Sequence, residues 1–172
     1  MVWLLILQAF WFIAPAYAAN AFPPLVRGKK PLDFGKRLHK HRILGNGKTF
    51  EGTIAGIVFG FCIGLIQMAM QPYIPKEIGL IEMNFTLILL LSTGAVVGDI
   101  LGAFTKRRFG IKRGSPAPLL DQLDFLVIAI LFASYAVSIP AYIILILLIL
   151  TPPIHWFANL IGYITRVKRT PW

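Results

Sequence analysis

The chain alternates between long apolar runs and shorter polar segments. The apolar runs occupy about 2–18, 50–70, 83–104, 123–138 and 141–164. A helix needs about 20 apolar residues to cross a bilayer, and Pro140 separates the last two runs, which together are too long for one span. The pattern therefore predicts an all-α integral membrane protein, in which residues 1–172 form a single polytopic domain with five transmembrane helices.

Composition agrees with this class. The chain is 57% hydrophobic and 14% charged, whereas about a quarter of the residues of a soluble domain are charged. The single cysteine, Cys62, lies in an apolar run, which excludes a disulfide framework and a cysteine metal site.

The first run fits two interpretations. The sequence Ala16-Tyr17-Ala18 resembles the small-residue site at which a signal peptide is cleaved. However, the run lacks the basic segment that precedes the apolar core of a signal peptide. We therefore favour a retained first helix over 2–18.

Basic residues are concentrated in three polar segments. Of the 17 Lys and Arg residues, eight lie in 20–48, five in 106–113 and three in 166–169. Five spans place these segments on one side of the membrane, and the excess of cations makes that side cytoplasmic. We therefore expect an outer N-terminus, a cytoplasmic C-terminus, and large cytoplasmic loops at 20–48 and 105–121 in the cell membrane.

Glycines recur every four residues in the second and third apolar runs. They are Gly52, Gly56, Gly60 and Gly64 in the second, and Gly94, Gly98 and Gly102 in the third. Small residues at this spacing let another helix approach closely. We predict that these two helices pack through the two stripes, and that a groove along them accommodates lipid chains.

Three aspartates lie where the third and fourth predicted helices reach the cytoplasmic side. A carboxylate inside an apolar run, as at Asp99, is usually functional, although an ion pair with Lys106 or a neighbouring loop cation is the alternative. Asp121 and Asp124 share one face of the opening turn of the fourth helix, where acidic residues also favour the helix dipole. Together with Asp99 they indicate a Mg²⁺ site, because Mg²⁺ binds one or two carboxylates plus substrate phosphates.

A glycine-rich segment precedes the second predicted helix. Residues 45–49, Gly-Asn-Gly-Lys-Thr, are not a Walker A motif, because Arg42 occupies the position of its first glycine and no βαβ unit surrounds it. Flexible glycines, a lysine and a helix N-terminus nevertheless attract phosphate. An ordinary glycine loop with an interfacial lysine is the alternative.

The segment from Gly98 to Phe125 resembles the signature of CDP-archaeol synthases, relatives of bacterial CDP-diacylglycerol synthases. The resemblance is carried by the pattern G-D-x-x-G-x-F-x-K-R-R-x-G-x-x-R-G, followed by P-x-P and D-Q-L-D-F. Residues 31–35, 44–52 and 168–172 are also similar to that family. The chain lacks the H-G-G-x-x-D-R-x-D pattern of the bacterial enzymes, which favours the archaeal ether-lipid branch.

The resemblance implies transfer of CMP from CTP to 2,3-bis-O-(geranylgeranyl)-sn-glycerol 1-phosphate, with Mg²⁺ as cofactor and pyrophosphate as product. It implies that Asp99, Asp121 and Asp124 bind the metal and form the catalytic centre with Lys106. The residues expected to bind CTP or the lipid phosphate are Gly47, Lys48, Thr49, Asn20, Asp33, Arg107, Arg108 and Arg113. The expected partners are CTP, the lipid phosphate and the bilayer, with no nucleic acid.

Three alternatives remain at this stage. A phosphatidate cytidylyltransferase would act on ester lipids with the same residues. An anion transporter would be expected to show an internal repeat and charge on both membrane faces, and the sequence has neither. A non-catalytic membrane scaffold would leave the grouped carboxylates unexplained.

Overall fold

Five long helices form the molecule. The computed structural model describes residues 2–39, 41–112 and 114–167. The long helices are α1 (Val2–Ala21), α3 (Phe50–Met70), α4 (Phe85–Arg108), α5 (Leu120–Ala133) and α6 (Ala141–Ile164). Short elements connect them: α2 (Pro23–Val26), η1 (Gln71–Tyr73), η2 (Lys76–Ile78) and the antiparallel strands β1 (Arg37–Leu38) and β2 (His41–Arg42). The predicted all-α membrane architecture is confirmed, with one small hairpin added in the first basic loop.

Four of these helices are long and apolar enough to span a membrane. The exception is α5, whose 14 residues span about 21 Å, less than the hydrocarbon thickness of about 30 Å. The expected fourth span, 123–138, therefore differs from the structure, in which the helix begins at Leu120 and ends at Ala133. Hydrogen-bonded turns continue the chain from Ser134 to Val137, where the expected span was still helical.

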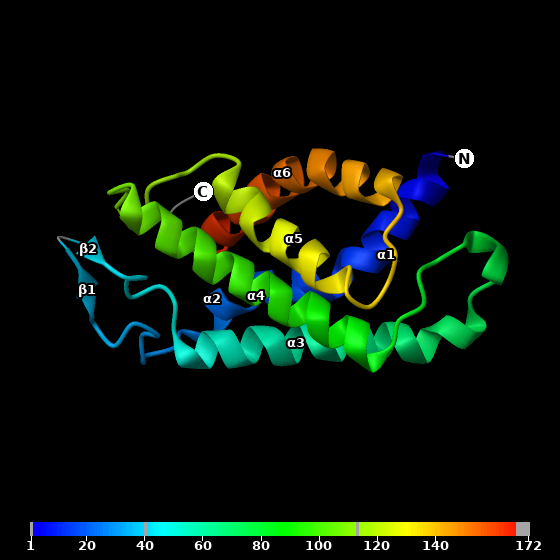
Figure 1. Cartoon of the computed structure of the whole chain (residues 1–172), viewed down its shortest axis with the longest axis horizontal. Helices are drawn as coiled ribbons and strands as arrows, with labels where there is room; N and C mark the ends of the chain where they lie inside the picture. Colours follow the sequence, from blue (N-terminus) through cyan, green and yellow to red (C-terminus); the bar gives the residue numbers. More distant parts are fainter. Residues whose placement is uncertain (1, 40, 113, 168–172) are drawn as a thin grey trace.

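The helix α1 lies at the centre of the bundle and contacts α3, α4, α5 and α6 (Figure 1). Its side chains Phe12 and Ile13 are fully buried, beside Leu91 of α4 and Leu126 of α5 in one continuous apolar core. This central packing is what a retained first helix requires.

The glycine stripes do not pack against each other, so that prediction is wrong. On α3, a Cβ added to Gly56 or Gly60 would lie 2.7 Å or 2.5 Å from backbone oxygens of α1. On α4, a Cβ added to Gly98 would lie 2.3 Å from the carbonyl oxygen of Asp124 in α5. Periodicity shows which glycines share a face but not which helix covers that face. Neighbouring helices cover the α3 stripe, whereas Gly98 and Gly102 of the α4 stripe line an apolar groove between α4 and α5, so the expected lipid groove adjoins only the second stripe.

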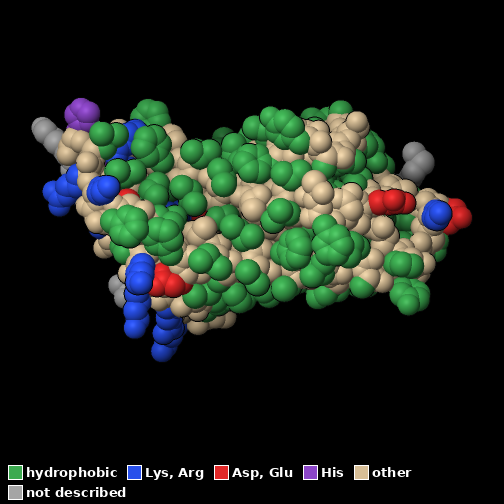
Figure 2. All heavy atoms as spheres, turned by 60° about the horizontal axis from the view of Figure 1, so that its bottom comes forward, with side chains coloured by type: hydrophobic (Ala, Val, Ile, Leu, Met, Phe, Trp, Pro, Cys, Tyr) green, Lys and Arg blue, Asp and Glu red, His purple; other side chains and the backbone are tan. Residues whose placement is uncertain are grey.

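The polar segments collect at one end of the bundle. The hairpin, the end of α4 and the end of α6 lie at the left in Figure 1, opposite the N-terminus and the connection between α3 and α4. Lys and Arg side chains gather at the same end in the space-filling view (Figure 2). The predicted loop 105–121 is shorter than expected, because α4 continues to Arg108. Basic residues in this last turn favour the helix dipole.

Candidate functional site

The first basic loop is organised around a buried carboxylate, Asp33. The side chain of Arg42 donates two hydrogen bonds to it, and the backbone amides of Gly35, Leu44 and Gly45 donate at 3.1, 3.0 and 2.9 Å. The Arg42 guanidinium and these amides hold the pKa of the Asp33 carboxyl well below its usual range. Both carboxylate oxygens are therefore used within the loop, and the structure does not favour the predicted contact of Asp33 with a nucleotide.

Replacing Asp33 with Asn is expected to loosen this loop by about 1.5 to 3 kcal/mol, because the bonds to Arg42 lose their charge. The readout is hydrogen exchange at the Leu44 and Gly45 amides. In the unmodified protein the lowered pKa contributes stability above about pH 4, and this stability decreases as the pH falls further. After correction for intrinsic rates, protection should decrease below that pH, and Glu77→Gln at the opposite end should leave it unchanged. Unaltered protection in Asp33→Asn would contradict this role.

A short two-stranded pairing positions the predicted phosphate-binding segment. The Leu32 amide donates to the Lys48 carbonyl at 2.8 Å, and the Phe50 amide donates to the Lys30 carbonyl at 2.9 Å. Thr49 then caps α3, its hydroxyl oxygen accepting a hydrogen bond from the Gly52 amide at 3.2 Å. This arrangement holds Gly47 and Lys48 immediately before the first turn of α3, whose Phe50 and Gly52 amides are already hydrogen-bonded within the protein.

Two lysines pair with two of the predicted aspartates. The ammonium group of Lys48, before α3, forms an ion pair with Asp99 of α4. The ammonium group of Lys106, in the last turn of α4, lies 2.6 Å from a carboxylate oxygen of Asp121 in α5. The Asp121 carboxylate also accepts a hydrogen bond from the Ala117 amide at 2.9 Å. The expected alternative for Asp99, an ion pair with Lys106 or a neighbouring loop cation, is therefore formed with the loop cation Lys48 and not with Lys106.

The third aspartate, Asp124, lies between these pairs on the contact surface of α4 and α5. A Cβ added to Gly102 of α4 would lie 1.8 Å from its carboxylate oxygen, so the carboxylate rests directly on the glycine backbone. It is close enough to interact electrostatically with Asp99, Asp121 and Lys48. The structure thus brings together the three carboxylates that the sequence places far apart.

Carboxylate oxygens are suitable ligands for a hard cation, but these three carboxylates are not arranged around a common metal position. Among the residues that the structure describes, no group of three His, Cys, Asp or Glu side chains has the arrangement of a metal site. Two of the aspartates are instead paired with lysines. Mg²⁺ needs only one or two carboxylates when phosphate oxygens complete its shell, so the donor set fits Mg²⁺ held together with a phosphorylated ligand.

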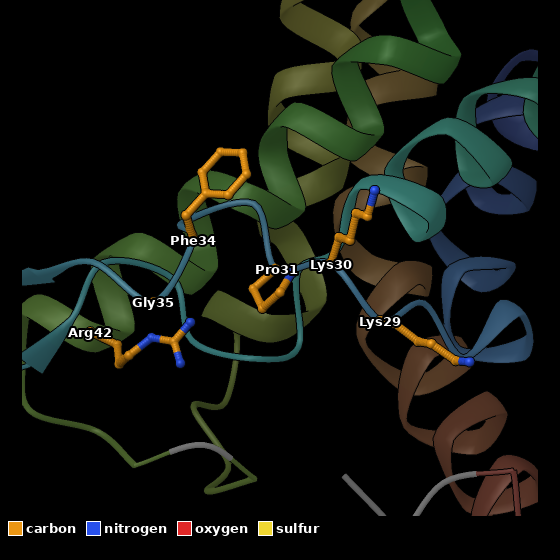
Figure 3. Close-up of a pocket in the computed structure, with 6 residues that line it drawn as sticks. All are labelled: Lys29, Lys30, Pro31, Phe34, Gly35 and Arg42. Carbon is orange, nitrogen blue, oxygen red and sulfur yellow. The ribbon is translucent and has the colours of Figure 1, made fainter.

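A basic pocket of about 580 Å³ opens beside the hairpin (Figure 3). Its lining residues are Lys29, Lys30, Pro31, Phe34, Gly35 and Arg42. It adjoins the predicted phosphate-binding segment, because the backbone of Lys30 and Leu32 pairs with that of Lys48 and Phe50. Sequence reasoning missed this pocket, and the signal that could have found it is the Lys29-Lys30 pair followed by an exposed aromatic residue, Phe34.

The remaining predicted cations differ in their placement. Arg108 donates to the carbonyl oxygens of Leu38 and Arg42 at 3.1 and 2.8 Å, so it fastens the hairpin to α4. The Arg107 side chain donates to the Ile111 carbonyl and closes the end of α4. Asn20 lies in the last turn of α1, at the same end of the bundle. Arg113 lies outside the described residues.

An apolar groove of about 280 Å³ runs between α4 and α5 and reaches Asp124. Leu101, Leu119 and Val127 line it and are about half exposed, at 47%, 60% and 49%. Exposed aliphatic side chains on membrane helices face lipid, so this groove connects the hydrocarbon region with the carboxylates.

The helical bundle, with its cations gathered at one end, defines a multi-pass membrane protein of the kind found among intramembrane enzymes. A family model described as CarS-like, CDP-archaeol synthase, matches residues 2–172. CDP-archaeol synthases of Pyrococcus horikoshii and Methanococcus maripaludis are each 44% identical, with at least 97% of both chains covered. A solved structure described as an intramembrane enzyme for archaeal membrane lipids biosynthesis is 34% identical, with a TM-score of 0.78 over 90% of this chain and 94% of that chain. The chain belongs to the CDP-archaeol synthase family.

Proposed function

We propose that this protein transfers CMP from CTP to 2,3-bis-O-(geranylgeranyl)-sn-glycerol 1-phosphate and forms CDP-archaeol and pyrophosphate. Membership of the CDP-archaeol synthase family supports this reaction. The observation that supports the assignment of the site is the pairing of Lys48 with Asp99 and of Lys106 with Asp121 at the basic end, together with an apolar groove that reaches Asp124. A charged centre next to a lipid-facing groove suits one water-soluble and one membrane-bound phosphate.

The reaction requires positioning and charge neutralisation more than a protein nucleophile. An oxygen of the lipid phosphate attacks the α-phosphorus of CTP, the bond from this phosphorus to the bridging oxygen breaks, and pyrophosphate leaves. In our proposal Lys48 and the glycine segment that ends at Gly47 bind CTP phosphates immediately before α3. Lys106 neutralises charge on the reacting phosphates. The pocket around Lys29 and Lys30 accommodates the rest of the nucleotide.

We further propose that Asp99, Asp121 and Asp124 hold Mg²⁺ together with these phosphates. When bound, Mg²⁺ would neutralise phosphate charge and orient the attacking and leaving oxygens. Arg107 and Arg108 keep the surrounding loops in place through their bonds to backbone carbonyls. The groove between α4 and α5 would align the isoprenoid chains so that the lipid phosphate reaches Asp124.

The test is direct. Purified protein is incubated with Mg²⁺, labelled CTP and either the unsaturated diether phosphate or ester-linked phosphatidate. We expect a CDP-lipid and pyrophosphate with the diether phosphate, and a much lower rate with phosphatidate. Preference for phosphatidate would support the alternative of an ester-lipid cytidylyltransferase, and no product with either lipid would contradict the proposed enzyme activity.

The proposed topology places the basic end in the cytoplasm and the N-terminus outside. In a Cys62→Ser background, Lys76→Cys in the connection between α3 and α4 should react with a membrane-impermeant maleimide in intact cells. Lys36→Cys near the hairpin should react only after the membrane is opened. The reverse pattern would contradict this orientation, and the Cys62→Ser protein without an added cysteine controls for background labelling.

A further inference from the structure

The lysine–aspartate pairs in the site place an ammonium group where a metal ion would be needed. Lys48 pairs with Asp99, and the Lys106 ammonium lies 2.6 Å from Asp121. The ammonium of Lys48 also acts electrostatically on Asp124. Two positive charges therefore already balance most of the charge of three carboxylates.

This balance opposes the binding of a divalent cation alone. A metal ion entering the resting site would meet two ammonium groups at close range, and like charges repel. It would also have to displace lysines from carboxylates that it needs as ligands. The lack of an assembled three-ligand group among the described residues agrees with this view.

A polyphosphate changes the balance, because it offers the lysines an alternative anionic partner. Lysine has three donors and no acceptor, and it binds phosphate as a point charge. The paired side chains of Lys48 and Asp99 are 24% and 29% exposed, and those of Lys106 and Asp121 are 17% and 23% exposed. Both pairs are partly exposed, so a triphosphate arriving from solvent can reach the lysines and take the place of the aspartates as their anionic partner.

We infer that the ammonium groups of Lys48 and Lys106 occupy the place of a metal ion and keep divalent metal from Asp99 and Asp121. A nucleoside triphosphate binds the two lysines and so releases the carboxylates for the metal. This inference rests on the metal assignment in the proposed function. Nucleotide and metal then bind cooperatively, because each removes an obstacle to the other. Coupling between two ligands of one protein is typically about 5- to 150-fold in affinity.

Mn²⁺ binding to the purified full-length protein, followed by the spectroscopic signal of free Mn²⁺, tests this inference without catalysis. No lipid phosphate is added, and Mn²⁺ bound by CTP itself is subtracted from a protein-free titration. We expect weak binding without CTP, and at least about fivefold tighter binding with CTP. Lys48→Met and Lys106→Met should each raise the affinity for Mn²⁺ without CTP by about the same factor, and should reduce the further effect of CTP.

Two controls separate the lysines' role from general effects of charge. Lys48→Arg keeps the positive charge beside Asp99 and should keep Mn²⁺ binding weak without CTP. Lys36→Met removes an exposed lysine that forms no ion pair with the described carboxylates, and it should behave like the unmodified protein. Thermal unfolding of each variant reports its folding, and the two independent lysine positions guard against one that fails to fold.

The possible outcomes separate a failure of this inference from a failure of the metal assignment on which it rests. If both methionine variants bind Mn²⁺ no more tightly than the unmodified protein, while CTP still promotes binding, the inference that the lysines keep metal from the carboxylates is overturned. The assignment of the metal site is then unaffected. If no protein binds Mn²⁺ beyond what CTP binds, the metal assignment and the inference are both overturned.

Discussion

Replacing Asp124 with Asn is expected to reduce CMP transfer by about 10²- to 10³-fold, the size of effect seen when one preorganised charge-stabilising group is lost. The Asn side chain has nearly the same shape, so it can still rest on Gly102 and preserve the contact between α4 and α5. What it removes is the negative charge between Asp99 and Asp121. The measurement is the initial rate of labelled CDP-lipid formation with both substrates saturating.

The matched control for this prediction is Glu82→Gln, which removes an exposed carboxylate near the opposite end of the bundle. Its rate should equal that of the unmodified protein. Both variants should elute as folded protein and unfold at a similar temperature. Full activity in Asp124→Asn would refute the assignment of this carboxylate to the catalytic centre.

The sequence predicted the helices well because each long apolar run must satisfy its backbone hydrogen bonds internally within a membrane. It could not predict where α5 ends. Residues 134–138, Ser-Tyr-Ala-Val-Ser, are less apolar than those before them, but this gradual change does not show at which residue the helix becomes turn. Apolar composition indicates in which region a helix lies, whereas local hydrogen bonding determines its last residue.

The sequence predicted the acidic residues of the candidate site but not the lysines with which they pair. Asp99, Asp121 and Asp124 are conspicuous because carboxylates are rare beside apolar runs. The pairing of Asp99 with Lys48 depends on how α3 lies against α4, and that of Asp121 with Lys106 on how α4 lies against α5, neither of which periodicity encodes. The same limit explains Asp33, which was expected to contact nucleotide but accepts its hydrogen bonds within its own loop.

The glycine contacts lead to the second large expected effect, in Gly102→Ala. The new Cβ would lie 1.8 Å from the Asp124 carboxylate oxygen and 2.7 Å from its carboxylate carbon. The Asp124 carboxylate should rotate away, and because the Asp124 Cβ would lie 2.9 Å from the new Cβ, the contact between α4 and α5 should also widen slightly. A misplacement of about 1 Å in a catalytic group costs about 10²-fold in rate. We therefore expect a loss of that size in kcat, measured as CDP-lipid formation, with little loss of stability.

Gly64→Ala provides the contrast, since its Cβ would lie 2.3 Å from the Ile88 side chain in the core contact of α3 with α4. Overpacking there should cost about 1 to 3 kcal/mol, partly offset by the better helix propensity of alanine, and should lower the thermal unfolding temperature. The rate per folded molecule should remain unchanged. If Gly102→Ala instead lost stability and kept its kcat, this glycine would serve only helix packing. If Gly102→Ala lowers kcat and keeps its stability, while Gly64→Ala loses stability and keeps its rate, then Gly102 is required because Asp124 must rest against bare backbone.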